Sequence, residues 1–178
     1  KVESNRNFAN KLWNVGRFVL GALDQAPDTP MREPIWTLAD SWIWARLQEL
    51  VRSVDRLFSA YQYGEAGRQI YDFIWGEFAD WYVEIAKIQL AEGGERAFWT
   101  GYTLVRVLDM SLRMLHPFTP FVTEELWGYL KQACLAHSVA FTPRHGWEEA
   151  LIVAEFPSVR GLEGWEDQKV TDFNLVQE

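Results

Sequence analysis

The chain has 178 residues, 48% of them apolar, and a formal net charge of -8 at pH 7. This length and apolar content suffice for one sizeable packed domain with a small appendage. The acidic balance argues against a general binder of polyanions. No apolar run approaches the roughly 20 residues that cross a bilayer, and a single cysteine, Cys134, excludes an internal disulfide framework and a cysteine metal cluster.

Positive charge is concentrated at the start of the chain. Residues 1–23 carry four cations and one acid, whereas residues 57–178 carry 9 cations and 18 acids. Any contact with a nucleic acid is therefore expected to be local to the N-terminal segment, because the remaining surface repels phosphate. The chain starts with Lys1 instead of Met, which suggests a piece of a longer protein.

The first predicted helix runs from about Ser4, its predicted N-cap, to Leu23. Its buried side recurs at steps of three and four: Phe8, Leu12, Val15, Val19 and Ala22. Two further stripes mix cations, amides and aromatic rings: Arg6, Asn10, Trp13 and Arg17 in one, and Asn7, Lys11, Asn14 and Phe18 in the other. Such groups suit unpaired bases, although periodicity alone favours an ordinary core helix with polar decoration.

Four more helices are predicted after a proline-rich connection at 25–36. Thr37 with Asp40 forms a capping box that starts the second helix, which ends near Ala60. A third helix follows Gly64 to about Leu90, where Gly93 and Gly94 stop it. The remaining two are expected at 95–115 and from the Thr119-Pro120 start signal to about residue 136.

The predicted architecture is an all-α antiparallel bundle of about five main helices over 1–136, with an irregular C-terminal extension. Residues 137–164 form an irregular strap with a possible short strand at 151–153. Residues 165–178, beginning at Trp165, have helical spacing and are interpreted as the first turns of a truncated helix.

No catalytic or metal site is expected from the side chains present. His116, His137 and His145 do not fall at a metal-ligand spacing, and no Gly-rich phosphate loop occurs. His116 is expected to interact with the carbonyls that end its helix. Glu124 and Glu125 are expected to complement the dipole of the fifth helix.

Four blocks of sequence resemble the valyl-tRNA synthetase family, in the same order as in that family. They are NFANKLWN with Arg17 and Phe18, LADSWI at 38–43 with Arg46 and Leu47, YDFIWGEFADWY at 71–82 with Glu84 and Lys87, and LHPFTPFVTEELW at 115–127. The resemblance implies the helical anticodon-binding domain of a class I aminoacyl-tRNA synthetase. The last block is shared more loosely with the isoleucyl and leucyl enzymes, and the third points to the valyl member.

The resemblance also implies partners and a cellular setting. The parent enzyme is a cytoplasmic valine–tRNA ligase that uses ATP with Mg, and its partner is valine tRNA, gripped at the anticodon loop. The ATP-binding signatures of the family are absent from this chain, so no cofactor and no aminoacylation are expected of it alone. The catalytic core of the same parent chain is a second expected partner, and no membrane is expected.

The matching motifs supply the predicted tRNA-binding residues: Arg6, Asn7, Asn10, Lys11, Trp13, Asn14, Arg17, Phe18 and Arg46. At least one of the asparagines is expected to bond to the backbone instead, and Arg17 to pair with an acid such as Asp80. One or two of Trp13, Phe18, Trp42 and Trp44 are expected to be exposed. The alternative is a docking bundle without base readout, which an exposed apolar patch on the first two helices would favour.

Overall fold

The computed structural model describes residues 2–27, 34, 36–137, 139–143, 146–158 and 166–177, and only the backbone at 2–5, 139, 166–167 and 177. Its elements are α1 (Val2–Leu23), α2 (Leu38–Ser59), α3 (Tyr63–Asp72), the π-helix η1 (Phe73–Tyr82), α4 (Val83–Ala91), α5 (Gly94–Leu115), α6 (Pro120–His137), the 3₁₀ turns η2 (Val139–Phe141) and η3 (Leu151–Val153), and α7 (Glu166–Gln177). No strand occurs among the described residues, and the predicted all-α class is confirmed.

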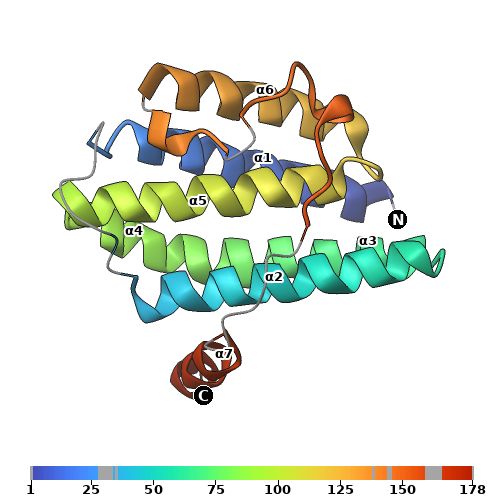
Figure 1. Ribbon diagram of the computed structural model, residues 1–178, viewed down its shortest axis with the longest axis horizontal. Helices are drawn as coiled ribbons and strands as arrows, with labels where there is room; N and C mark the ends of the chain where they lie inside the picture. The colour runs from blue at the N-terminus through green and yellow to red at the C-terminus, as the bar shows by residue number, and fades with distance from the viewer. Residues whose placement is uncertain are drawn as a thin grey trace.

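The long helices form an antiparallel bundle with α5 at its centre (Figure 1). The elements α3, η1 and α4 follow one another without a break, and together they are called the central rod (residues 63–91). On one side α5 packs against α1 and α6, and on the other against α2 and the central rod (Figure 1). The five long helical segments predicted from the sequence are therefore present over 2–137, and consecutive segments run in opposite directions.

Local signals set the ends of several helices. The hydroxyl of Thr37 accepts a hydrogen bond from the backbone N–H of Asp40 (3.1 Å), and the Asp40 carboxylate accepts from the N–H of Thr37 (2.9 Å). This is the predicted capping box at the start of α2. Gly93 (φ 71°) and Gly94 (φ 52°) make the turn into α5 in the left-handed region that glycine adopts at little cost.

Two predicted helix starts need correction in detail. α1 begins at Val2, so Ser4 lies inside the helix and is not its N-cap. α6 begins at Pro120 as predicted, but the buried hydroxyl of Thr119 has no hydrogen-bond partner among the described residues. The proline, whose fixed φ suits the first turn, therefore carries this start signal without a side-chain cap.

The core takes in the aromatic side chains that the sequence placed ambiguously. Trp42 is buried and Trp44 half-buried, so neither is an exposed stacking surface. Cys134 is buried as expected for a small core residue, and burial together with the negative charge of Asp109 raises the pKa of its thiol to about 12.

The possible strand at 151–153 is wrong, since this segment is the 3₁₀ turn η3. The carboxylate of Glu124 accepts hydrogen bonds from the backbone N–H groups of Leu151 (2.7 Å) and Ile152 (3.1 Å). These bonds satisfy the donors that a partner strand would otherwise take. Glu124 therefore holds the segment on α6, a role more specific than the dipole interaction expected of it.

A buried arginine fastens the same part of the chain to α5. The guanidinium of Arg113 lies 3.0 Å from Asp109 one helical turn away and 3.0 Å from Glu148, and it also donates to the carbonyl of Glu155 (3.1 Å). The segment 146–158 lies within the strap predicted at 137–164, and the name strap is kept for this described segment alone. Charge-assisted hydrogen bonds hold it at both η3 and Glu148.

The histidines take structural positions. The Nδ1 atom of His116 lies 2.9 Å from the Thr123 hydroxyl, so this ring bridges α5 to α6 and does not bind the end carbonyls as expected. His137 lies 3.1 Å from Asp24, which joins the ends of α6 and α1. His145 lies outside the described residues. No group of three or more metal-ligating side chains occurs in the described ranges.

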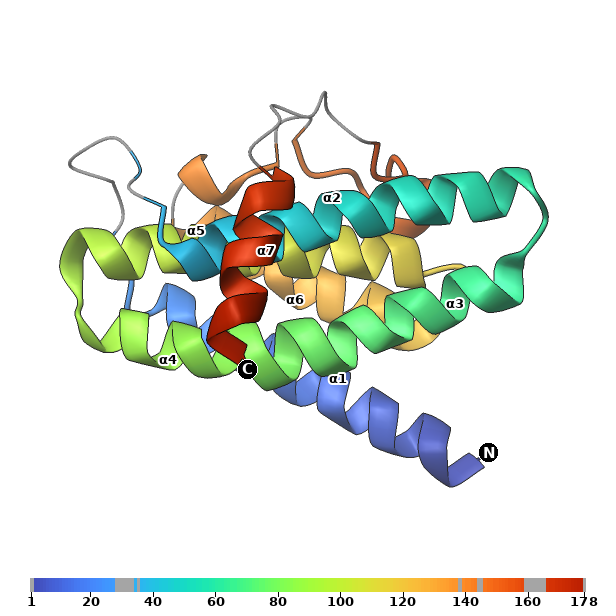
Figure 2. The same ribbon diagram turned by 90° about the horizontal axis from the view of Figure 1, so that it is seen from below.

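The helix at the C-terminal end, α7, lies across α2 and the central rod (Figure 2). Its Phe173 is 4% exposed and stacks on Trp42 at 4.1 Å between ring centroids, with the edge of Trp81 at 6.3 Å. The predicted helix at 165–178 is therefore present from Glu166, while Trp165 lies outside the described residues.

Candidate nucleic-acid interface

One side of α1 faces outward along its length. The five side chains on it are exposed: Arg6, Asn7, Asn10, Asn14 and Arg17. With about 3.6 residues per turn, these positions fall on a single face opposite the buried stripe of Phe8, Leu12 and Val15. We call these five residues the α1 face.

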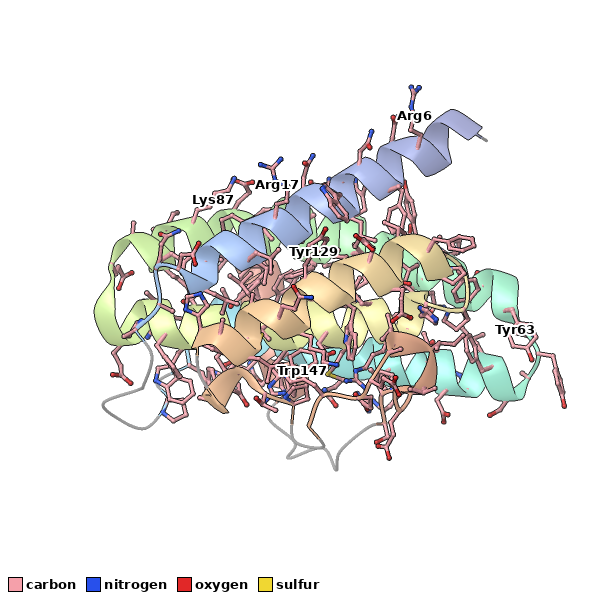
Figure 3. All side chains as sticks on the ribbon, turned by 90° about the horizontal axis from the view of Figure 1, so that it is seen from above. Arg6, Arg17, Tyr63, Lys87, Tyr129 and Trp147 are labelled. Carbon is pink, nitrogen blue, oxygen red and sulfur yellow. The ribbon has the colours of Figure 1, made fainter. Side chains whose placement is uncertain are left out.

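The polar groups of the α1 face are largely uncommitted. Within the described residues, Asn7, Asn10 and Asn14 make no hydrogen bond through their amides, and Arg17 makes no ion pair. The expectations that an asparagine bonds to the backbone and that Arg17 pairs with Asp80 are therefore wrong for this part of the chain. Figure 3 shows Arg6 and Arg17 projecting to the same side of the molecule as Lys87 on α4.

Aromatic side chains border the α1 face on both sides. Trp13 is half-buried and meets the ring of Tyr129 on α6 edge to face, with 6.0 Å between centroids. Phe18 is also half-buried, and the ammonium of Lys87 lies 6.0 Å from its ring centroid. Lys87 itself donates to both carboxylate oxygens of Glu84 (2.7 and 2.9 Å), the attraction expected from their spacing.

Lys11 is held between two side chains of the central rod. Its ammonium lies 2.5 Å from the Oδ1 atom of Asp80 and 4.0 Å from the ring centroid of Trp75. The lysine side chain is 24% exposed, while that of Asp80 is 52% exposed. The more accessible member of this pair is therefore the hydrogen-bond acceptor.

The π-helix η1 explains how Trp75 and Asp80 reach the same lysine. In an α-helix, residues five apart point roughly 140° away from each other around the axis. Hydrogen bonding from residue i to i+5, as between the carbonyl of Phe78 and the N–H of Val83, brings positions five apart onto one side. Periodicity read as an α-helix separates these two residues, and so the sequence concealed the arrangement.

Arg46 differs from the residues of the α1 face because its guanidinium is already paired with acidic side chains. Its guanidinium contacts both carboxylate oxygens of Glu77 (2.6 and 2.9 Å) and also pairs with Glu49. The hydrogen bond to Glu77 raises the pKa of Arg46 despite the opposing effect of burial. This bidentate pair links α2 to the central rod and occupies the donors that would otherwise meet a phosphate.

The first two helices carry no large exposed apolar side chain among the described residues. The most exposed ones lie elsewhere, at Phe121 (92%), Tyr61 (81%) and Ile152 (73%). Along the described ranges, no helix combines the length and the apolar character that crossing a membrane requires. The face that combines amides and cations is therefore distinct from the apolar patches of the surface.

Three relatives illustrate what this chain is similar to. A valine–tRNA ligase of Dehalococcoides mccartyi (strain CBDB1) is 45% identical over 159 residues, which cover 89% of this chain and 17% of that protein. A valine–tRNA ligase of Bacillus thuringiensis subsp. konkukian is 44% identical over 165 residues, which cover 90% of this chain and 17% of that protein. A valine–tRNA ligase of Halalkalibacterium halodurans is 40% identical over 180 residues, which cover 100% of this chain and 19% of that protein.

The chain thus spans less than a fifth of the length of these relatives. The family described as the anticodon-binding domain of tRNA ligase matches residues 40–178, which run from the third residue of α2 through α7. α1 precedes the matched stretch and is covered by the alignment to the Halalkalibacterium protein. Because the family match takes in well over half of the chain, the chain belongs to the family of anticodon-binding domains of tRNA ligases.

Proposed function

We propose that this chain is the anticodon-recognition module of a valine–tRNA ligase, and that the α1 face contacts the anticodon loop. The observation that carries the proposal is the row of uncommitted amides beside Arg17 on the outward side of α1. Relatives identical at 40–45% that are named valine–tRNA ligases support the choice of tRNA.

The chemistry of the row suits an unpaired loop. Each asparagine amide offers two donors and one acceptor oxygen, and so can bind the edge of a splayed base. Arg17 can bind a phosphate or stack on a base, and the partly exposed rings of Trp13 and Phe18 border the row. Arg46 is left out of the contact surface, because Glu77 and Glu49 already engage its guanidinium.

In this proposal the chain binds tRNA and the rest of the ligase performs the chemistry. ATP with Mg and the reacting groups belong to the catalytic core of the same parent chain, which is the second partner of this domain. The docking alternative predicts an apolar patch on the first two helices, and the described part of α1 and α2 offers amides and cations there instead.

The test is titration of the 178-residue chain with two anticodon stem-loop hairpins at low salt. One hairpin carries a valine anticodon and the other an unrelated anticodon. Tighter binding of the valine hairpin is expected, and equal affinity for both would contradict base readout by this domain.

Two matched variants locate the contact surface. Arg17→Ala is expected to weaken binding and to reduce the salt slope by about 0.7–0.9 if one phosphate contact is lost. Arg56→Ala, an exposed arginine of α2, is the control and should leave both quantities unchanged. If the two variants behave alike while circular dichroism shows intact helices, the α1 face is not the contact surface.

A further inference from the structure

We propose that Asp80 reads a base directly, by accepting a hydrogen bond from the exocyclic amino group of adenine or cytosine in the anticodon. The proposal rests on the proposed function and deepens it, because it assigns a specificity-determining residue on the central rod. It also changes the role of Lys11 from a contact to RNA into the residue that positions Asp80.

Exposure decides which partner of the pair can meet RNA. The Lys11 ammonium is enclosed by the ring of Trp75 and by one carboxylate oxygen of Asp80, and its side chain is 24% exposed. The Asp80 side chain is 52% exposed, and its second oxygen, Oδ2, makes no hydrogen bond with a described residue. The group that this pair presents outward is therefore a carboxylate oxygen held in place.

The location of Asp80 fits base recognition. Lys11 has Asn7 and Asn14 as its neighbours at four and three residues along α1, so Asp80 stands at the border of the α1 face. A carboxylate cannot bind a phosphate, which it repels. At the border of a surface that meets RNA, it can instead accept hydrogen bonds from base amino groups, which adenine and cytosine carry and guanine and uracil lack at the corresponding ring position.

The genetic code makes this chemistry relevant to valine. Valine codons begin with GU, so a valine tRNA carries A and C at the last two anticodon positions. Both bases present an amino group on the pairing edge. Where the Asp80 oxygen meets this exocyclic position, the keto oxygen of G or U would face it as a second acceptor with no proton between them, which disfavours both bases.

The experiment measures binding of the 178-residue chain to three hairpins: one with the valine anticodon, one with A replaced by G, and one with C replaced by U. Each swap keeps the ring size and exchanges the exocyclic amino group for a keto group, with a proton added at the neighbouring ring nitrogen and, in guanine, a further amino group at C2. The penalty of a swap is the ratio of its Kd to that of the valine hairpin. We expect Asp80→Asn to reduce the penalty of one swap by about tenfold, because an amide can also donate to a keto oxygen.

Two control variants separate direct readout from indirect effects. Lys11→Met keeps an unbranched chain against Trp75 without the charge. It should lower the penalty less than Asp80→Asn does, because the Asp80 carboxylate remains while the group that positions it is lost. Asp72→Asn alters an aspartate of the same rod that is 54% exposed and paired with Arg68, and should change nothing. Asp80→Asn also frees the Lys11 ammonium, which would change the Kd of every hairpin by the same factor. The penalty is a ratio of two Kd values, so this common factor cancels.

The outcomes distinguish this inference from the proposed function. An Asp80→Asn variant that keeps both penalties, or that loses affinity by one factor for all hairpins, overturns the inference. A Lys11→Met variant that loses the penalty as Asp80→Asn does overturns it as well, since Asp80 would then act only through the lysine. A wild-type chain with no penalty for either swap instead contradicts base readout itself, and with it the proposed function.

Discussion

Trp75 and Asp80 stand five residues apart on one helical rod and both touch the ammonium of Lys11 on α1. The contact ties the helix that carries the proposed tRNA surface to the middle of the bundle. A cation over a tryptophan ring contributes about 0.5–1 kcal/mol at an exposed site, and an exposed ion pair a similar amount or less. The arrangement therefore fixes the position of a few groups more than it stabilises the fold.

The buried Arg113 is expected to be the most sensitive charged residue of the bundle. Arg113→Met would leave Asp109 buried without its cation and release the bonds to Glu148 and Glu155. Removing one partner of a buried pair costs about 3–5 kcal/mol, so a loss of this size is expected in the free energy of unfolding measured with urea.

Arg68 provides the matched control for Arg113. It forms ion pairs with Glu65 and Asp72, but its side chain is 59% exposed. Water compensates an exposed guanidinium that loses its partners, so Arg68→Met should leave the urea midpoint nearly unchanged. Equal losses in the two variants would contradict the expected difference between a buried and an exposed ion pair.

Lowering the pH is expected to destabilise the fold by protonating Glu148, which pairs with Arg113 and attaches the strap to α5. Burial alone would raise the pKa of Glu148, but hydrogen bonds from Arg113 and from backbone N–H groups together lower it below its ordinary value of 4.5. Because the folded-state pKa is the lower one, Glu148 stabilises the fold above pH 4.5 and loses this contribution as the pH falls through the folded pKa.

The measurement compares wild type with Glu148→Gln by urea unfolding from about pH 7 to about pH 3. The gap between their free energies of unfolding should narrow as the pH falls. A gap that stays constant would show that the Glu148 charge does not contribute. Asp109 has the opposite pH dependence. Burial raises its pKa, so its contribution to the free energy of unfolding is present at low pH and is lost as the pH rises through the folded-state pKa.

Two glycines of α1 are expected to respond to alanine with opposite signs. A Cβ atom at Gly16 would lie 2.3 Å from Cδ1 and 3.0 Å from Cγ of the buried Leu126 on α6, whereas one at Gly21 meets nothing within 4 Å. Gly21→Ala should raise the free energy of unfolding by about 0.5–1 kcal/mol through helix propensity. Gly16→Ala should lower it by about 1 kcal/mol, since overpacking outweighs that gain. Thermal unfolding of both variants decides the signs.

The sequence predicted the bundle well because its signals are local. The capping residues Thr37 and Asp40 and the Gly93–Gly94 turn act within a few residues, and the apolar stripe of α1 follows from helical spacing alone. The short apolar run at 151–153 could not be resolved in this way. Its conformation depends on Glu124, a carboxylate 27 residues earlier that reaches its backbone only in the folded chain.

The candidate site was predictable in composition but not in detail. Spacing along α1 placed its amides and cations on outward stripes, and the structure exposes Asn7, Asn10 and Asn14. The same spacing could not show that Lys11 and Arg46 are occupied by acids of the central rod. Those pairings depend on how three helices approach one another, and for Asp80 also on the i to i+5 bonding of η1.

The attachment of α7 is expected to depend on a single ring. Among the side chains described for α7, that of Phe173 is the buried one, and it stacks on Trp42 with centroids 4.1 Å apart, whereas Leu175 on the same helix is 68% exposed. Truncating a buried phenylalanine costs about 3–5 kcal/mol. Val170 also packs against the core but is only partly buried. The contacts that remain are expected to hold α7 weakly, since an isolated 12-residue helix is marginal in water.

Phe173→Ala should therefore release α7 while the bundle stays folded, because α2 and the central rod keep their contacts with α5. Hydrogen exchange of the backbone amides is the measurement: fast exchange is expected in α7 and unchanged protection in α5. Leu175→Ala is the control and should leave α7 protected. If α7 remains protected in Phe173→Ala, its attachment lies in other contacts, and if α5 loses protection as well, α7 is an integral part of the bundle and not an appendage to it.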